Sequence, residues 1–146
     1  MFIAGNIFDN AAYSQTSLAK KLGIKQGFKI RCVNAPGYYF KLFSDLPQDI
    51  TVSDDKRIKK DFIHVFVQNA KQLESTMPKV KNEIEENGMI WISWYKKVSK
   101  IPTDVTEDLV RKIALENGLV DVKVCAVDDL WSGLKLVIPV KNRTRK

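Results

Sequence analysis

The chain has 146 residues, of which 45% are hydrophobic, so it is long and apolar enough to form one domain with its own core. No apolar run reaches the roughly 18–20 residues that a membrane-spanning helix needs. The first residues carry no basic segment, and Gly5 and Asn6 interrupt their apolar stretch, which predicts a cytoplasmic protein without a secretory signal.

The chain contains few cysteine and histidine residues that could bind a metal ion. Cys32 and Cys125 both lie inside predicted strands, which favours buried free thiols in a reducing cytoplasm over a disulfide or a ligand pair. A single histidine and two cysteines offer no metal-ligand spacing. The sequence therefore predicts no metal site.

The net charge is +7, and many of the basic residues are clustered along the chain. The clusters are Lys56, Arg57, Lys59 and Lys60; Lys96, Lys97 and Lys100; and Lys141, Arg143, Arg145 and Lys146. Such clusters can bind nucleic acid or another polyanion, but a solvated face and a basic tail explain the same residues. No nucleic-acid-binding motif is present to favour the first interpretation.

The first half of the chain alternates short helical and short strand patterns. In order, these predict an arm over 1–15, a helix from Thr16 or Ser17 to Gly23, a strand over 28–33, a helix over 39–46, a strand over 50–52, and at most two helical turns over 53–58. Asn34-Ala-Pro-Gly37 is typical of a turn, and Pro47 ends the second helix.

A strand–helix–strand unit organises the middle of the chain. Its strands are the apolar runs over 62–67 and 88–94, and both are continuous enough to be buried on two faces of a parallel sheet. The helical pattern between them covers 69–87 and contains Pro78, which predicts a kink or two abutting helices.

The last third of the chain predicts a helix followed by a hairpin. Asp104 and Glu107 have the spacing of a capping box, and the helix that they open ends at Gly118. Strands over 120–127 and 134–138 follow, and the link between them is short enough to require an antiparallel pair.

Together these elements predict an α/β fold. The expected architecture is a Rossmann-like, doubly wound and mostly parallel sheet of five to six strands, with helices on both faces and a C-terminal antiparallel hairpin. The expected organisation is an arm over 1–15, one domain over 16–140 and a basic tail over 141–146.

Four stretches carry a resemblance to known proteins. They run from Tyr13 to Lys25, over Asn34-Ala-Pro36, over Trp94-Tyr-Lys-Lys97 with Thr103-Asp104, and from Gly118 to Lys135. They resemble a family of small bacterial proteins that carry a domain of unknown function, although Tyr95 stands where that family leads us to expect a proline. The order of elements over 62–138 also resembles the second half of the class I S-adenosylmethionine-dependent methyltransferase fold.

The methyltransferase resemblance implies a cofactor site. In that fold, S-adenosylmethionine lies on a glycine-rich loop after the first strand, and an acid that ends the second strand holds the ribose hydroxyls. Here the loop contains Gly37 alone, followed by Tyr38 and Tyr39, and Asp54 or Asp55 stands where the acid would be. The sequence therefore departs from the usual cofactor loop.

A ligand site is expected at the carboxyl ends of the strands, where open α/β sheets bind their ligands. This rule predicts that the ligand-binding residues are Asn34, Tyr38, Tyr39, Gln68, Asn69, Trp94, Lys96, Lys97, Asp128 and Trp131, with Tyr95 and Asp129 beside them. Trp94 and Trp131 could hold a planar ring between them, with a lysine on an anionic group, or they could pack beneath the loops.

No catalytic constellation is apparent in the sequence. The only histidine, His64, lies in the middle of a predicted strand, which favours a buried, hydrogen-bonded imidazole over an acid–base role. The leading hypothesis is a non-catalytic Rossmann-like domain that binds a small molecule or a protein. The alternatives are an S-adenosylmethionine-dependent methyltransferase with an atypical cofactor loop and a nucleic-acid or polyanion binder.

Overall fold

The structure is a computed structural model, and it describes residues 16–144. Its strands are β1 (Lys29–Val33), β2 (Thr51–Val52), β3 (Lys60–Phe66), β4 (Ile84–Tyr95), β5 (Val120–Ala126) and β6 (Trp131–Val137). Its helices are α1 (Leu18–Leu22), α2 (Ala70–Lys81) and α3 (Glu107–Glu116), with 3-10 turns η1 (Tyr39–Leu42), η2 (Lys97–Ser99) and η3 (Val140–Asn142).

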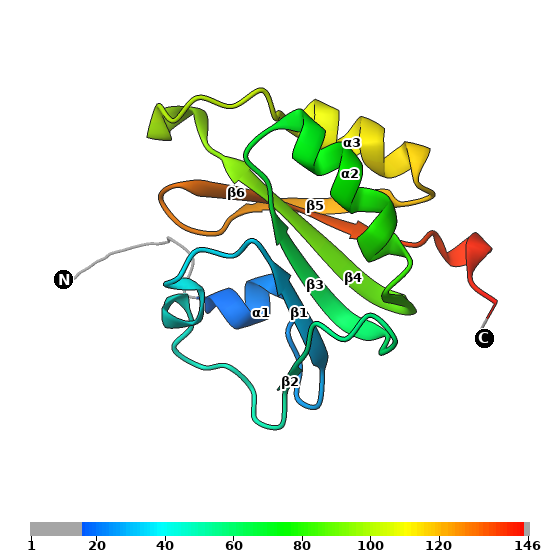
Figure 1. Cartoon of the computed structure of the whole chain (residues 1–146). Coiled ribbons are helices and arrows are strands. Elements are labelled where there is room, and N and C mark those ends of the chain that lie inside the picture. The colour runs from blue at the N-terminus through cyan, green and yellow to red at the C-terminus, as the bar shows by residue number, and fades with distance from the viewer. Residues whose placement is uncertain (1–15, 145–146) are drawn as a thin grey trace.

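The six strands form one sheet in the order β2-β1-β3-β4-β6-β5 (Figure 1). Strands β2, β1, β3 and β4 run parallel to one another, and β6 is antiparallel to both β4 and β5. The predicted Rossmann-like α/β fold with a C-terminal antiparallel hairpin is therefore confirmed. The basic tail lies only partly within the described residues, and the N-terminal arm lies outside them.

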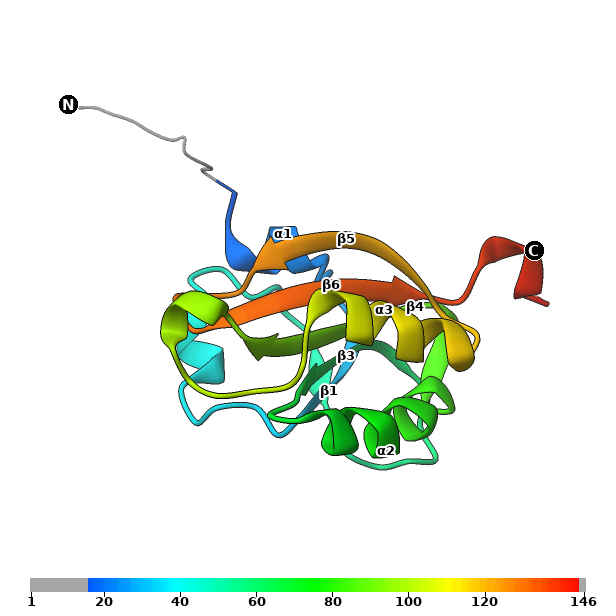
Figure 2. The same ribbon diagram turned by 90° about the horizontal axis from the view of Figure 1, so that it is seen from above.

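The helices cover the sheet from both sides, with α1 on one face and α2 and α3 on the other (Figure 2). Strand β3 is buried on both faces because its side chains alternate between two cores. Ile63 and Val65 pack into the core beneath α2 and α3, whereas Phe62 and Phe66 pack on the side of α1. No helix within 16–144 combines the length and apolar character needed to cross a membrane.

Three of the helices predicted from the sequence differ from what the structure contains at those positions. The helix predicted over 39–46 is only the turn η1, because Phe43 is already extended. No helix forms over 53–58, where the side chains of Ser53 and Asp55 accept nearby backbone N–H groups and stabilise turns instead. The helix predicted over 69–87 ends at Lys81 and runs through Pro78 as one element.

The start of α3 also differs from the prediction. The N-cap is Thr106, whose hydroxyl accepts the N–H of Leu109 at 3.1 Å, so the predicted capping box at Asp104 is wrong. The carboxylate of Asp104 instead accepts the N–H of Ala70 at 2.7 Å. An acid three residues before one helix thus caps the start of a different helix, which sequence spacing alone does not show.

Strand β4 begins earlier than predicted because its pairing with β3 is irregular. Lys60 pairs with Ile84 but Phe62 pairs with Met89, so extra residues of β4 bulge out between the two pairs. Gly88 lies in this bulge. A Cβ at Gly88 would lie 2.9 Å from the carbonyl oxygen of Asp61 and 3.1 Å from that of Glu85.

We expect Gly88→Ala to lower the free energy of unfolding by about 1–3 kcal/mol, because the added methyl group meets two backbone oxygens that cannot move independently. Urea denaturation measures the change. Gly37→Ala is the matched control, because a Cβ at Gly37 has no neighbour within 4 Å. An equal effect of the two substitutions would contradict the proposed role of the bulge.

Candidate functional site

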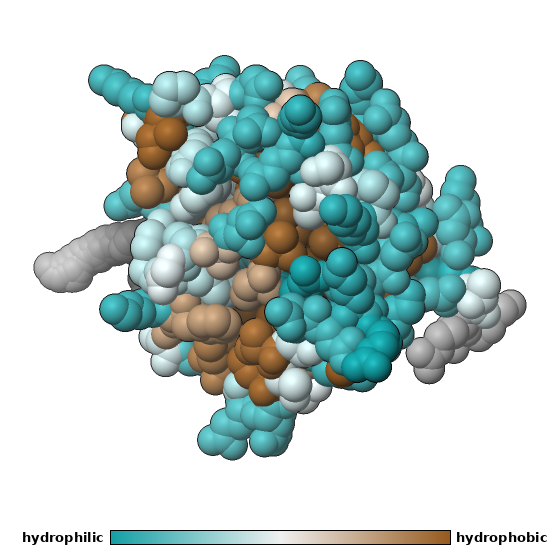
Figure 3. All heavy atoms as spheres, in the orientation of Figure 1, coloured by the Kyte–Doolittle hydropathy of each residue, from teal (hydrophilic) through white to brown (hydrophobic). Residues whose placement is uncertain are grey.

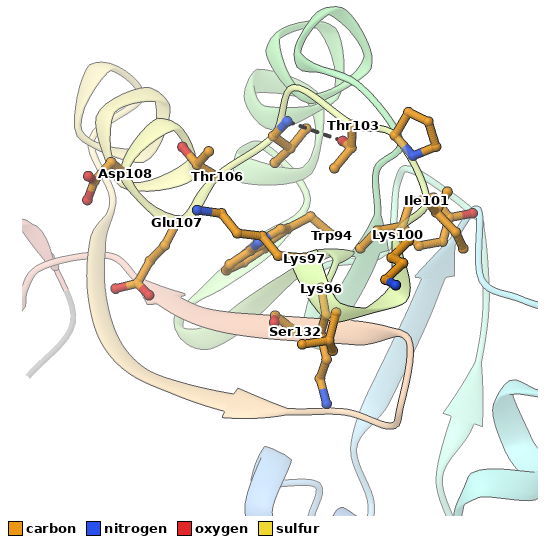
Figure 4. A pocket seen from close by; sticks show the side chains of 14 residues that line it. Trp94, Lys96, Lys97, Lys100, Ile101, Thr103, Thr106, Glu107, Asp108 and Ser132 are labelled. Carbon is orange, nitrogen blue, oxygen red and sulfur yellow. Dashed lines mark hydrogen bonds between the residues drawn. The ribbon is translucent and has the colours of Figure 1, made fainter.

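A hollow of about 930 Å³ opens at the carboxyl end of β4 (Figure 4). Its wall is formed by the end of β4, the basic loop that follows, the start of α3 and one residue of β6. Among the predicted site residues, Trp94, Lys96 and Lys97 line it. Its volume is within the range of small-molecule sites.

A second hollow of about 610 Å³ adjoins the first and extends it toward β3. Gln68 and Asn69 line it, and the two hollows share the wall formed by Tyr95 and residues 101–103. The hydroxyl of Thr103 donates to the carbonyl of Gln68 at 2.8 Å. Together with the bond from Ala70 to Asp104, this contact fixes the loop after β4 against the start of α2.

Tyr38 joins the loop after β1 to the hairpin turn. Its hydroxyl donates to the carboxylate of Asp128 at 2.9 Å and accepts the indole N–H of Trp131 at 3.2 Å. Partial burial, followed by the hydrogen bond to Asp128, raises the pKa of Tyr38. Because β3 and β4 lie between β1 and β6 in the sheet, this contact bridges the carboxyl edge.

The predicted tryptophan sandwich does not form. Trp94 pairs in register with Ser132, whereas the neighbouring Tyr95 pairs with Trp131, so the two indoles point to opposite faces of the sheet. Trp94 packs in the core beneath α2 and α3. Trp131 instead stacks on Tyr95, with ring centroids 4.2 Å apart.

Polar groups around β1 and β2 lie where the fold would hold an adenosyl cofactor. Asn34 is exposed in the left-handed region at φ 57, and Gly37 is exposed with open space at its Cβ position, so a ligand can approach both backbones. Asp54 follows the carboxyl end of β2, is exposed and forms no ion pair or hydrogen bond within residues 16–144. The open backbone and the free carboxylate fit such a cofactor. Tyr38 does not, because its side chain is already bound to Asp128 and Trp131 of the hairpin.

Tyr39 does not belong to the carboxyl-edge site. It is buried beneath the sheet, where its hydroxyl lies 3.0 Å from Nδ1 of His64. Nε2 of His64 lies 2.8 Å from the hydroxyl of Ser93, and burial lowers the pKa of this imidazole to about 3. The prediction of a buried, satisfied histidine is confirmed.

The cysteines are free thiols, as predicted, and each is partly buried. Burial raises the pKa of Cys32 to about 11, with a smaller opposing effect from the hydrogen bond of Tyr39. A low proportion of thiolate follows, so Cys32 is a poor nucleophile. No group of three or more His, Cys, Asp or Glu residues within 16–144 is placed to hold a metal ion.

The basic cluster predicted over 56–60 is not a continuous cationic surface. Lys60 is fully buried, with its ammonium group against Glu83 and the carbonyl of Asp55, so it was wrongly assigned to a polyanion surface. Arg57 is paired with Asp55, and Lys59 donates to a backbone carbonyl. Lys56 and Lys141 remain candidates, whereas Arg143 donates to the carbonyl of Ile138 at 2.9 Å, and Arg145 and Lys146 lie outside the described residues.

The residues that the sequence analysis missed lie at the start of α3. Thr106, Glu107 and Asp108 line the large hollow, together with Lys100 and Ser132. A helix that follows a parallel strand begins at the carboxyl edge, so the topology could have placed its first turn at the site. The predicted capping box also placed these residues in the first turn of the helix, but the expected site was limited to residues that directly follow the strands.

No protein-family model matches the sequence, and no curated protein is significantly similar to it. Solved structures do share its fold. A S-adenosylmethionine-dependent methyltransferase from Aquifex aeolicus has a TM-score of 0.59 and 16% identity over 84% of this chain and 88% of that chain. Fibrillarin from Aeropyrum pernix, with natively bound S-adenosyl-L-methionine, has a TM-score of 0.55 and 14% identity over 82% and 73%.

A third similar structure is magnesium protoporphyrin IX methyltransferase from Synechocystis PCC 6803 with bound cofactor, at a TM-score of 0.56 and 10% identity over 84% of this chain and 74% of that chain. At such identities the likeness is one of fold. The resemblance to the bacterial family with a domain of unknown function stays a prediction. The chain thus has the class I S-adenosylmethionine-dependent methyltransferase fold, in agreement with the second resemblance in its sequence.

Proposed function

We propose that the protein is an S-adenosylmethionine-dependent methyltransferase whose ligands bind along the carboxyl edge of its sheet. The observation that carries the proposal is the fold shared with proteins solved with that cofactor bound. The hollows beyond β3 and β4 support it, because they provide room for a methyl acceptor at the same edge of the sheet as the loops after β1 and β2. This function replaces the non-catalytic domain as the leading hypothesis.

The chain offers specific groups for each part of the reaction. The backbone at Asn34 and Gly37 is open to the cofactor, and the carboxylate of Asp54 is free to accept bonds from ribose hydroxyls. When bound, the cofactor supplies an electrophilic methyl group. The protein contributes mainly by positioning the acceptor and excluding water, which are large effects in reactions of two bound molecules.

The test is calorimetry with S-adenosylmethionine on the full chain. We expect micromolar binding, and Asp54→Asn should weaken it by about tenfold, the usual scale for losing charged hydrogen bonds to hydroxyl groups. Asp45→Asn is the matched control, because Asp45 is also exposed and unpaired within residues 16–144 but precedes β2. Binding that is absent, or weakened equally by both variants, would overturn the proposed cofactor site.

A second candidate is a non-catalytic domain that binds a small molecule or a protein at the same edge. The observation that favours it is the contact of Tyr38 with Asp128 and Trp131, which closes the loop after β1 against the hairpin. It predicts that a folded protein fails to bind the cofactor, and that Tyr38→Ala does not create binding. Binding of a polyanion through the exposed lysines is a further proposal. It predicts that the binding affinity falls steeply as the salt concentration rises.

A further inference from the structure

We propose that the large hollow at the end of β4 is an oxyanion subsite, which takes the carboxylate or phosphate group of a small molecule. The inference rests on the proposed function only in naming that molecule as the methyl acceptor. The binding of the anion itself needs no cofactor. Three features of the hollow support it, and each comes from a different element.

The first feature is a group of lysine ammonium groups that form no salt bridge within residues 16–144. They belong to Lys96, Lys97 and Lys100, which all lie on the loop that lines the hollow. In Figure 4, the Lys97 side chain extends into the hollow between Trp94 and Thr106, whereas Lys96 points away from it. Lys97 is therefore the cation placed to meet a ligand.

The nearby carboxylates form no ion pair with these lysines within residues 16–144. Glu107 and Asp108 line the hollow, but both form salt bridges with Arg111, which lies on the next turn of α3. Asp104 is held by the N–H of Ala70. The acidic groups at this edge therefore have partners, and the lysines do not.

The second feature is the amino end of α3. The N–H groups of Glu107 and Asp108 precede the first intrahelical bonds, which begin with Val110 donating to Thr106. The helix dipole adds partial positive charge at the same place. A helix end alone would not define a site, but this one adjoins a cavity that also contains unpaired cations.

The third feature is the indole N–H of Trp94. Trp94 is only 7% exposed, yet its indole N–H has no hydrogen-bond partner within residues 16–144 and is not sealed from solvent. The other two tryptophans are satisfied, since Trp91 donates to the carbonyl of Leu22 at 2.9 Å and Trp131 donates to Tyr38. A buried indole N–H usually has a partner, so that of Trp94 is available to a ligand.

These groups are all donors, which defines the chemistry of the ligand. An ammonium group, two helix N–H groups and one indole N–H favour a compact group with several acceptor oxygens and negative charge. Val98, 79% exposed, and Ile101 add an apolar rim, and Figure 3 shows apolar surface where η2 lies in Figure 1. The ligand therefore combines an oxyanion with an apolar body.

The test is a titration of the ¹⁵N-labelled full chain at constant ionic strength, in the absence of cofactor. Benzoate and inorganic phosphate are the two probes, and they distinguish a carboxylate from a phosphate ligand. The chain has three tryptophans, and we expect the indole signal of Trp94 to shift and saturate while those of Trp91 and Trp131 stay in place. Trp94→Phe assigns the signal and should weaken binding.

Lysine variants supply the matched comparison. Lys97→Gln should weaken binding of the better probe by about tenfold, whereas Lys96→Gln, one residue away, should change it by less than about twofold. Equal effects of the two substitutions would overturn the subsite in favour of general charge attraction, as would a common shift of all three indole signals. Cofactor calorimetry is independent of this titration, so failure of either proposal can be recognised separately.

Discussion

Replacement of Glu83 by glutamine is expected to lower the free energy of unfolding by about 3–5 kcal/mol, because the fully buried Lys60 and the partly buried Arg31 lose the one carboxylate that they pair with within residues 16–144. Lys60 is fully buried, with Nζ 3.3 Å from the Glu83 carboxylate. Arg31 contacts both Glu83 oxygens, at 2.5 and 2.6 Å. The Nε of Arg31 is buried without a partner, so within residues 16–144 the side-chain hydrogen bonds of this guanidinium all go to Glu83. Urea denaturation at pH 7 measures the loss.

The surface ion pairs of α3 provide the control. Glu107→Gln removes one of the carboxylates that surround the more exposed Arg111, while Asp108 and Asp121 remain. Such pairs are worth about 0–1 kcal/mol, so this variant should unfold nearly as the parent does. If Glu107→Gln and Glu83→Gln had similar effects, burial would not be the reason for the importance of Glu83.

The same cluster makes stability sensitive to acid. Burial on its own would raise the pKa of Glu83, but the hydrogen bonds and charges of Arg31 and Lys60 lower it below its ordinary value of 4.5. A lowered folded-state pKa stabilises the fold above the unfolded-state value, and that stabilisation is lost as the pH falls through the folded-state pKa. Glu83→Gln should therefore show a smaller loss of stability below pH 4.5 than the parent.

This cluster also illustrates the limit of prediction from sequence. Lys60 belongs to a run of basic residues, and such runs usually lie in solvent. Its burial depends on Arg31 and Glu83, which lie 29 and 23 residues away in the sequence, and no local pattern connects them. The strands themselves were predictable, because continuous apolarity in β3 and β4 is a property of each segment alone.

The residues around the two hollows were predictable to a similar degree. The carboxyl-edge rule located Gln68, Asn69, Trp94 and Lys97 at the hollows, because it depends only on strand direction. It could not predict from which face of the sheet each side chain projects. Trp94 and Trp131 point to opposite faces because of the cross-strand register of β4 and β6, and register is set by the complete sheet.

His64 is expected to reduce stability as the pH falls from 6.5 to 5.0, by about 2 kcal/mol over that interval. The imidazole is fully buried, stacked on Phe66 with centroids 4.3 Å apart, and burial lowers its pKa to about 3. The unfolded chain binds a proton below pH 6.5 and the folded chain does not, so acid favours unfolding. Urea denaturation at several pH values measures the slope.

His64→Gln separates this effect from the rest of the protein. Glutamine retains a donor and an acceptor for Tyr39 and Ser93 but does not titrate, so the variant should have a lower stability at pH 7 and a nearly flat profile down to pH 5. The interval is clean because His64 is the only histidine of the chain and most carboxyl groups titrate at lower pH. A parent profile as flat as that of the variant would mean that the folded protein can protonate His64, and the buried imidazole would then have to reach solvent.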